Sequence, residues 1–401
     1  MSRPAAIPES ASSRDPDGVD SAAFSLLVDV LRDGTIPAAS GEDAGAQAPA
    51  PVVARAIQLA VEHGVAPTFA RSVKASAVPL PAALATRLDE LLRESAVNAF
   101  WWTSELKGVL EALAIAHLDV MPLKGPFFAD RFYGGAAYRP CRDLDLLVRR
   151  EDFERAEAVL ARQGFQAASE GDDYHRTWIR GSTGLELHFD VENPLAFDFD
   201  LEAAWRRASS SEAFGHPVCE LETTDEFVFL CLHAARHRFE RLSHVLDLAQ
   251  MLRQRPVLRT ALPNLRRELA GLRGVVALGC LMARRLLPTG SAEISLPLPE
   301  KQAAPMRTLA AGLWRDLACG PHAPLDWAGQ HRFFLDLESG RVNRLARRVR
   351  HLRILAARLI DEDYAFAARL GLRRRWHARL LRPVRLALDS GSTRRELENA
   401  D

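Results

Sequence analysis

Residues 123–148, LKGPFFADRFYGGAAYRPCRDLDLLV, contain the change of pattern that decides the fold. Together with the preceding HLDVMP, they predict a short strand, a glycine turn, a short helix and a half-buried strand, RDLDLLV. The next stretch, EDFERAEAVLARQGF, has acids in its first turn and arginine in its last, so it predicts a helix ending at Gly164. Strands are expected again at 165–168, 174–179 and 185–191. A mixed sheet is the arrangement that this order favours.

Two aspartates, Asp143 and Asp145, lie two positions apart in the second predicted strand. Side chains at i and i+2 point to the same face of a strand, so two carboxylates are expected side by side. Their repulsion is costly unless a cation binds. Magnesium is the expected cation, because it takes hard oxygen ligands and bridges carboxylates to substrate phosphates. A D-x-D pair also occurs by chance on surface strands, so the pattern alone is not specific.

Lys124 and Gly125 stand where the first strand gives way to a helix. A glycine there lets backbone amides approach a triphosphate, and a helix N-terminus favours anions. Lysine occurs at only four positions in this arginine-rich chain, which favours a phosphate contact over a solvated turn lysine.

A third acidic ligand is expected from LELHFDV, residues 185–191, which puts Glu186, His188 and Asp190 on one strand face. Two-metal phosphoryl transfer needs such a carboxylate from a neighbouring strand. Glu186 is the first choice and Asp190 the alternative, because alternation alone does not separate them. His188 is expected to contact the nucleotide or to support a ligand, and a structural histidine is the competing interpretation.

In combination, these residues resemble the signature of an uncharacterised bacterial nucleotidyltransferase family within the DNA polymerase β-like superfamily. The residues at motif positions are Lys124, Gly125, Tyr133, Arg139, Pro140, Asp143, Asp145, Gly164 and Glu186, and in a later helical segment His233, His237 and Asp247. The resemblance covers roughly residues 85–255. Two positions depart from it: Pro126 follows Gly125 in place of serine or glycine, and Arg142 stands where glycine is frequent.

The resemblance implies a small sheet with flanking helices, two Mg²⁺ ions, and transfer of a nucleoside monophosphate from an NTP with release of pyrophosphate. The acceptor is not implied, and a peptide, a protein, a sugar or a small metabolite fits equally. Arg139 and Arg142 would join Lys124, Gly125 and His188 as nucleotide contacts. His233, His237 and Asp247 would line the pocket. The alternative is a non-catalytic nucleotide- or partner-binding module, such as an antitoxin-like subunit.

The predicted fold class is therefore α+β, a small mixed-sheet core with flanking helices and a mostly α-helical C-terminal half. Its parts are expected as a linker with one short helix (1–50), an N-terminal helical region (51–118), the α/β core (119–200), a helical region covering the nucleotide (201–290), arginine-rich helices (291–388) and a disordered tail (389–401). Residues 80–117 predict one long amphipathic helix, with Phe100, Trp101 and Trp102 on its core face.

The overall composition bears on the partners, metal sites and location that can be expected. Acidic and basic residues number 52 each, so net charge gives no argument for a nucleic-acid or membrane partner. The five scattered cysteines form no zinc spacing and fit a reducing cytosol. With neither a secretory leader nor a long apolar run in the sequence, the expected location is cytoplasmic. The arginine-rich residues 341–385 keep RNA or an anionic carrier as a less favoured partner, and the sequence carries no signal for an oligomeric state.

Overall fold

The computed structural model describes residues 18–36, 49–76, 78–168, 174–191, 197, 199–321, 333–337, 366 and 369–370. The expected linker around 37–48, almost all of the arginine-rich stretch 341–385 and the tail 389–401 lie outside the described residues.

The segment 120–148 supplies two strands of a five-stranded mixed sheet. The strand order of the sheet is β1 (Val120–Pro122), β2 (Leu144–Val148), β5 (Thr183–His188), β4 (His175–Arg180) and β3 (Gln166–Ala167). Strands β2 and β5 run parallel, and the other neighbouring pairs are antiparallel. The predicted α+β class with a small mixed sheet is thus confirmed.

Strand β2 is buried on both faces. Leu144, Leu146 and Val148 point to one face, where they pack with the long helix α4 (Ala82–Ile115) and with α6 (Phe153–Arg162). Leu147 points to the other face and joins the larger hydrophobic core of the molecule. By strict alternation Asp145 shares that second face, so its carboxylate lies on the side of the larger core.

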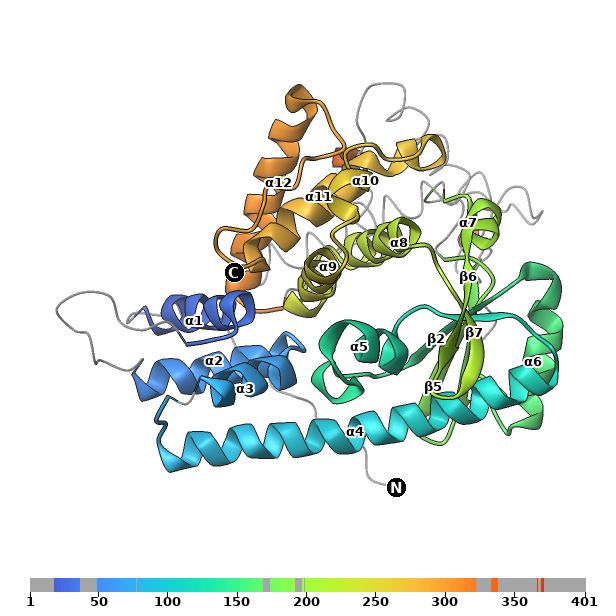
Figure 1. Ribbon diagram of the computed structural model, residues 1–401, viewed down its shortest axis with the longest axis horizontal. Coiled ribbons are helices and arrows are strands. Elements are labelled where there is room, and N and C mark those ends of the chain that lie inside the picture. Colours follow the sequence, from blue (N-terminus) through green and yellow to red (C-terminus); the bar gives the residue numbers. More distant parts are fainter. Residues whose placement is uncertain are drawn as a thin grey trace.

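Helices cover both faces of the sheet. Figure 1 shows α5 (Gly125–Tyr133) on one side and α6 on the other, with α4 running beneath the sheet and on to the N-terminal helices. These are α1 (Val19–Asp33), α2 (Ala50–Glu62) and α3 (Ala66–Ala75). Helix α1 packs not only on α2 but also on α12 (Glu300–Ala318) and on the short helix η4 (Arg284–Leu286), so the first described helix contacts some of the last ones.

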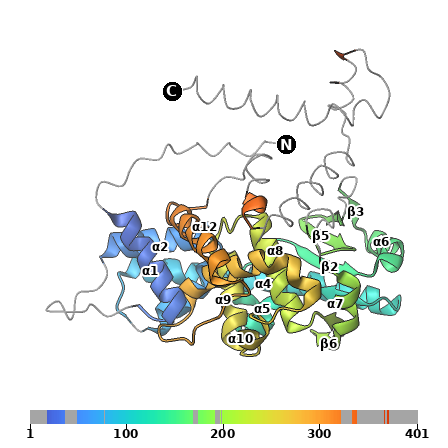
Figure 2. The ribbon, with the colours of Figure 1, turned by 90° about the horizontal axis from the view of Figure 1, so that it is seen from above.

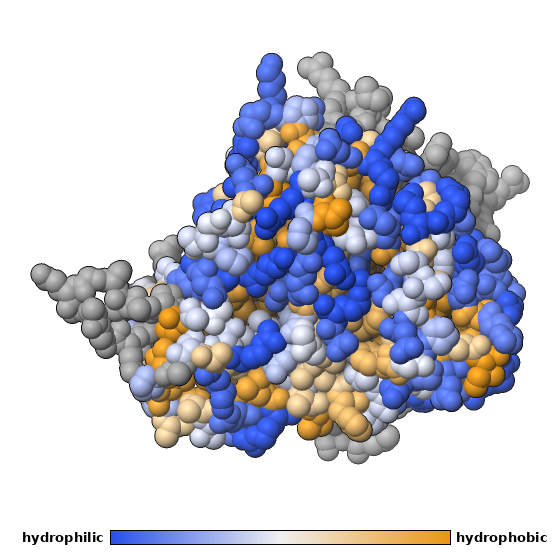
Figure 3. All heavy atoms as spheres, viewed as in Figure 1, coloured by the Kyte–Doolittle hydropathy of each residue, from blue (hydrophilic) through white to orange (hydrophobic). Residues whose placement is uncertain are grey.

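The prediction that Phe100, Trp101 and Trp102 form one core face was wrong for two of the three. Trp102 is buried, but Phe100 is 79% exposed and Trp101 47% exposed. Successive helical residues lie about 100° apart, so one buried face holds Trp102 and leaves its neighbours outside. Figure 3 shows hydrophobic atoms along the lower edge of this view, where α4 runs.

Beyond residue 200 the described chain is mostly helical, with one departure from the expectation. After α7 (Leu201–Arg207), strands β6 (Ser209–Ala213) and β7 (His216–Glu220) form a hairpin in a stretch that was expected to be helical. Its two-residue turn, Phe214-Gly215, has positive φ at both positions (51° and 90°), as a type I′ turn requires.

The remaining helices form the second half of the molecule. They are α8 (Thr223–Arg236), α9 (Leu242–Gln254), α10 (Leu258–Ala261), α11 (Arg273–Ala283) and α12, with 3-10 turns η3 (Arg267–Leu272) and η4. Figure 2, seen from above, shows α8, α11 and α12 over α4 and α5. Among the described helices, none combines the length and the apolar content needed to cross a bilayer.

Candidate functional site

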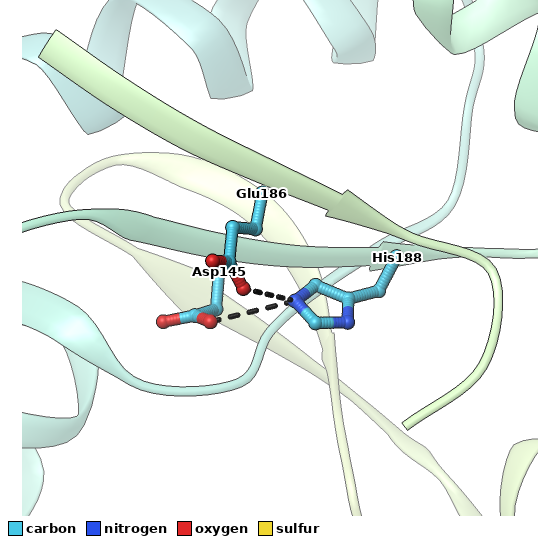
Figure 4. A group of neighbouring side chains, drawn as sticks. All are labelled: Asp145, Glu186 and His188. Atoms are coloured by element: carbon cyan, nitrogen blue, oxygen red, sulfur yellow. Dashed lines mark ion pairs between the residues drawn. The ribbon is translucent and has the colours of Figure 1, made fainter. Parts of the chain in front are cut away.

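Two carboxylates face each other across the parallel strands β2 and β5. The register pairs Asp145 with Glu186, and His188 lies two positions further along β5 on the same face. The Nε2 atom of His188 is 3.4 Å from Oδ1 of Asp145 and 3.4 Å from Oε2 of Glu186, as Figure 4 shows. One ligand atom from each of the three residues lies within 4.8 Å of the other two.

The register also bears on the two candidates for the third acid. Asp190 lies beyond the end of β5, where its carboxylate accepts a hydrogen bond from the backbone N–H of Val191 at 2.8 Å. Glu186 is the acid that the ladder brings opposite Asp145.

Lys124 and Asp143 lie beside Asp145, near the start of β2. Asp143 precedes β2 and is half-buried, so it lies beside the strand end and not within the ladder. Lys124 Nζ is 3.2 Å from Asp145 Oδ1. Gly125 begins α5 with φ of +72°, a left-handed conformation that glycine adopts without strain. A Cβ atom added there would come within 3.7 Å of Cys141 Sγ and 3.8 Å of the Asp143 carbonyl oxygen.

The two aspartates differ in their electrostatic surroundings. Burial and repulsion from Asp145 raise the pKa of Asp143 to about 6. Burial also disfavours ionisation of Asp145, but Lys124 and His188 outweigh it and hold the pKa of Asp145 below its usual range. Burial acts against the His188 imidazolium, yet hydrogen bonding to Asp145 and Glu186 raises the pKa of His188. Asp145 is therefore ionised at neutral pH, compensated by the nearby cation.

The donor set fits a metal ion. Asp145 Oδ2 is buried and makes no hydrogen bond within the described chain, although a buried carboxylate oxygen ordinarily has a partner. Two carboxylates and one imidazole converge on that region, and Asp143 adds a further acid beside Asp145. Carboxylate oxygens suit Mg²⁺ and Mn²⁺, and imidazole also accepts softer divalent ions.

An open cavity of about 260 Å³ borders Asp143 and Asp145, whereas Glu186 and His188 are not part of its lining. On the sheet side its lining includes Lys124, Gly125, Asp143 and Asp145. The opposite wall comes from α8, α9 and their connection, with His233, His237, Glu240, Arg241, Ser243 and His244. His233 and His237, which the resemblance assigned to the pocket, do line it. Figure 1 shows why this is possible, since α8 and α9 lie directly above α5.

Three imidazoles gather on that wall. The ring centroids of His233, His237 and His244 are 4.9 to 5.5 Å apart. Lys124 Nζ is 3.4 Å from Nε2 of His233. Burial lowers the pKa of each histidine, helped at His233 by Lys124 and at His237 by Arg236, and for His237 the value falls to about 4. All three are neutral at pH 7.

Arg139 and Asp247 bind each other. The guanidinium donates to both carboxylate oxygens of Asp247 at 2.8 Å, and the Tyr133 hydroxyl donates to Oδ1 at 2.6 Å. Arg139 still borders the cavity, whereas Asp247 is not part of its lining. Arg142 is exposed at the cavity edge and makes no ion pair with Asp143, Asp145 or Glu186.

Sequence reasoning missed Glu240, Arg241, Ser243 and His244. They follow the turn between α8 and α9, in which Arg238 and Phe239 both have positive φ (52° and 55°). Arginine and phenylalanine rarely adopt this conformation, so the sequence does not predict a turn there. His244 falls on the first turn of α9, so it reaches the cavity only because the turn brings α9 back beside α8.

Comparison with known proteins assigns the chain to a family. The model of a family described as "uncharacterised nucleotidyltransferase" matches residues 52–288, more than half of the chain. No protein of curated function matches the sequence. A solved structure titled "tRNA-processing enzyme (apo form 2)" is similar at 16% identity over 70% of this chain and 92% of that chain, with a TM-score of 0.21. A similarity of that size has no bearing on function.

Proposed function

This chain belongs to the uncharacterised nucleotidyltransferase family, and from that premise we propose that it transfers a nucleoside monophosphate from an NTP to an acceptor and releases pyrophosphate. The observation that supports this most directly is the meeting of Asp145 and Glu186 on adjacent parallel strands, with Asp143 beside them and Lys124 at 3.2 Å. Asp143, Asp145 and Lys124 border one cavity, and Glu186 lies behind it beside Asp145.

In this proposal Asp143, Asp145 and Glu186 hold two Mg²⁺ ions. Bound Mg²⁺ would neutralise the phosphate charge and lower the pKa of the attacking group. Three acids need such a counter-charge, because Lys124 and His188 offset only part of their repulsion. A divalent cation would also release the proton that Asp143, with its pKa of about 6, holds at lower pH.

Nucleotide binding is assigned to the start of α5 and its surroundings. Lys124, once its partner Asp145 is occupied by metal, is free to contact the phosphates, and Gly125 leaves room for them. Pro126 removes one amide donor from this helix start. Arg142, exposed at the cavity edge, can add a phosphate contact, and His188 would contact the nucleotide or orient Glu186. Arg139 would act mainly through Asp247, since its guanidinium already donates two hydrogen bonds to that carboxylate.

The test uses NTP labelled in the α-phosphate and measures pyrophosphate release and labelled product, with and without Mg²⁺. Asp143→Asn and Asp145→Asn are expected to abolish the metal-dependent activity, while Asp119→Asn, whose side chain is 64% exposed away from the cavity, is expected to retain it. Retained activity in the Asp145 variant would remove this assignment. Tight NTP binding without pyrophosphate release by the wild type would instead favour the non-catalytic module.

A further inference from the structure

One face of the long helix α4 carries hydrophobic side chains that the rest of the described chain leaves exposed. Val97 is 72% exposed, and Phe100 and Trp101 lie outside the core as well. Positions three and four apart are neighbours on a helix, so the three side chains form one patch. Figure 1 shows α4 along an outer edge of the molecule, and Figure 3 shows hydrophobic atoms along the same edge. A contiguous hydrophobic patch with a polar rim is typical of an interaction surface.

Val97 and Phe100 belong to a straight stripe of exposed residues along α4. Each helical residue is turned by about 100° from the last, so positions spaced alternately four and three apart return to the same side. Six exposed residues follow that spacing, and they lie within about 40° of one line along the helix. They are Arg93, Val97, Phe100, Ser104, Lys107 and Glu111. The same alternation of four and three is found along the contact line of paired helices.

The charged residues of α4 differ according to whether they lie on this stripe. Those outside it have ion-pair partners within the chain, and the pairs are Arg87–Glu90, Arg87–Glu94, Lys74–Asp89 and Arg180–Glu105. Those on the stripe, Arg93, Lys107 and Glu111, make no ion pair with any described residue. Charges of both signs on one exposed line are therefore available to a second molecule.

We propose that this stripe is a contact surface between two copies of the chain, whose α4 helices pack antiparallel about a two-fold axis at position 102. The six stripe positions lie two, five and nine residues to either side of that position. An antiparallel pair therefore brings Arg93 opposite Glu111 of the partner subunit, and Glu111 opposite Arg93 of the partner subunit. A two-fold interface uses the same surface on both copies, so it requires this kind of self-complementarity.

The middle of the stripe also complements itself in the antiparallel arrangement. Phe100 faces Ser104 of the partner subunit, a small side chain that leaves room for the ring. Val97 faces Lys107 of the partner subunit, whose aliphatic stem can cover an apolar neighbour. A parallel pair would instead place Arg93 beside Arg93 and Glu111 beside Glu111, where like charges repel. The signs of the charges thus favour the antiparallel dimer.

The size of the stripe indicates how tightly the two copies would bind. From Arg93 to Glu111 the helix rises about 27 Å. Contact between two helices over that length is at the small end of specific interfaces, so a dissociation constant on the order of micromolar is expected.

The main test is sedimentation equilibrium of the full chain over micromolar concentrations. Arg93→Glu or Glu111→Arg alone puts like charges opposite each other at two places, and each is expected to raise the dimer Kd about tenfold. The double variant Arg93→Glu/Glu111→Arg restores opposite charges at both places and should return the Kd to the wild-type value. The matched control is Lys301→Glu, which reverses an exposed charge on α12.

The outcomes that overturn the proposal are distinct. A wild type that stays monomeric at these concentrations removes the dimer. If that monomer binds vesicles of phosphatidylcholine and phosphatidylglycerol, and Phe100→Ser abolishes the binding, the stripe contacts a membrane instead. A dimer that Phe100→Ser leaves unchanged uses another surface. Single charge variants that weaken the dimer without recovery in the double variant exclude the antiparallel register. None of these measurements requires nucleotide or activity, so their result is independent of the proposed function.

Cross-linking tests the register directly. The background is Cys319→Ser, because Cys319 is exposed. Arg93→Cys and Glu111→Cys proteins, mixed in equal amounts with a short bismaleimide, should form a covalent dimer. Either protein alone should form none, since the antiparallel register places identical positions about 27 Å apart along the helices. A covalent dimer from one variant alone would overturn this register.

Discussion

The ammonium group of Lys124 lies 3.2 Å from a carboxylate oxygen of Asp145, and both side chains are nearly buried, at 10% and 3% exposed. The residue expected to contact phosphate therefore neutralises a residue expected to bind metal. The two roles are compatible if the lysine is displaced toward the phosphates when a cation takes its place beside Asp145. The metal ion and Lys124 then compete for one carboxylate.

That competition gives the first prediction. Lys124→Gln should bind Mn²⁺ roughly tenfold more tightly than the wild type. In this variant the ion no longer has to displace an ammonium group from Asp145, and His188 is the remaining neighbour of that carboxylate. The KM for NTP should rise, since a phosphate contact is lost. Calorimetry with Mn²⁺ and steady-state kinetics measure the two effects, and Lys107→Gln, on the exposed face of α4, is the control. Weaker Mn²⁺ binding in Lys124→Gln would contradict the competition.

The second prediction separates the two candidates for the third acid. Glu186 faces Asp145 in the ladder, whereas Asp190 accepts a hydrogen bond from Val191 N. Glu186→Gln should lower Mn²⁺ affinity by about 10- to 100-fold, and Asp190→Asn should leave it unchanged. The paramagnetic resonance signal of free Mn²⁺ reports the bound fraction. The opposite ranking would transfer the ligand role to Asp190.

The third prediction concerns the buried pair of Arg139 and Asp247. Replacing Asp247 with leucine leaves a buried guanidinium without its partner, which should lower the free energy of unfolding by about 3–5 kcal/mol. The double variant Arg139→Met/Asp247→Leu should recover most of that loss, because no unpaired charge remains. Urea unfolding followed by circular dichroism measures both, with Asp119→Asn as the exposed control. If the double variant is no more stable than Asp247→Leu, the pair is not the cause.

The fourth prediction tests the packing of α11 against α8 and α9, the helices that carry His233 and His244. A Cβ added to Gly279 of α11 would lie 2.4 Å from Sγ of Cys231 on α8 and 3.4 Å from Cδ1 of Leu248 on α9. Gly279→Ala should therefore cost about 1–3 kcal/mol of stability, and Cys231→Ala should relieve most of it.

Gly312 of α12 provides the matched substitution. A Cβ at Gly312 meets nothing within 4 Å, so Gly312→Ala should raise stability by up to about 1 kcal/mol through helix propensity. Thermal unfolding of the two alanine variants compares them directly. Equal effects of the two would mean that α8 and α11 are not in the close contact described.

Features that depend on neighbours in sequence were predictable. The spacing of Asp143 and Asp145, the glycine turn after Lys124 and the long helix α4 follow from local periodicity, and the structure has these elements close to the expected bounds. The mixed sheet followed from the order of strands and helices.

Features that depend on contacts between segments far apart in the chain could not be predicted from the sequence. That Glu186 pairs with Asp145 depends on the register of β2 against β5, which no residue type specifies. Arg139 was assigned to the nucleotide, but its partner Asp247 is 108 residues away in the chain. The exposure of Phe100 and Trp101 depends on how α4 is rotated against the sheet. The sequence shows which charged and aromatic residues are present, but it does not show which residues they contact in the folded chain.

The packing of α1 on η4 and α12 has a consequence for the order of events on the ribosome. Helix α1 is made first, but these partners are made only when translation has passed residues 284–318. The hydrophobic cluster around the sheet, in contrast, is complete within residues 102–218. The strands that hold Asp145 and Glu186, and the cluster on one face of their sheet, are therefore made before α8 and α9, which carry His233 and His244. If the sheet forms at that stage, the two carboxylates meet while water still surrounds them, and water weakens their repulsion.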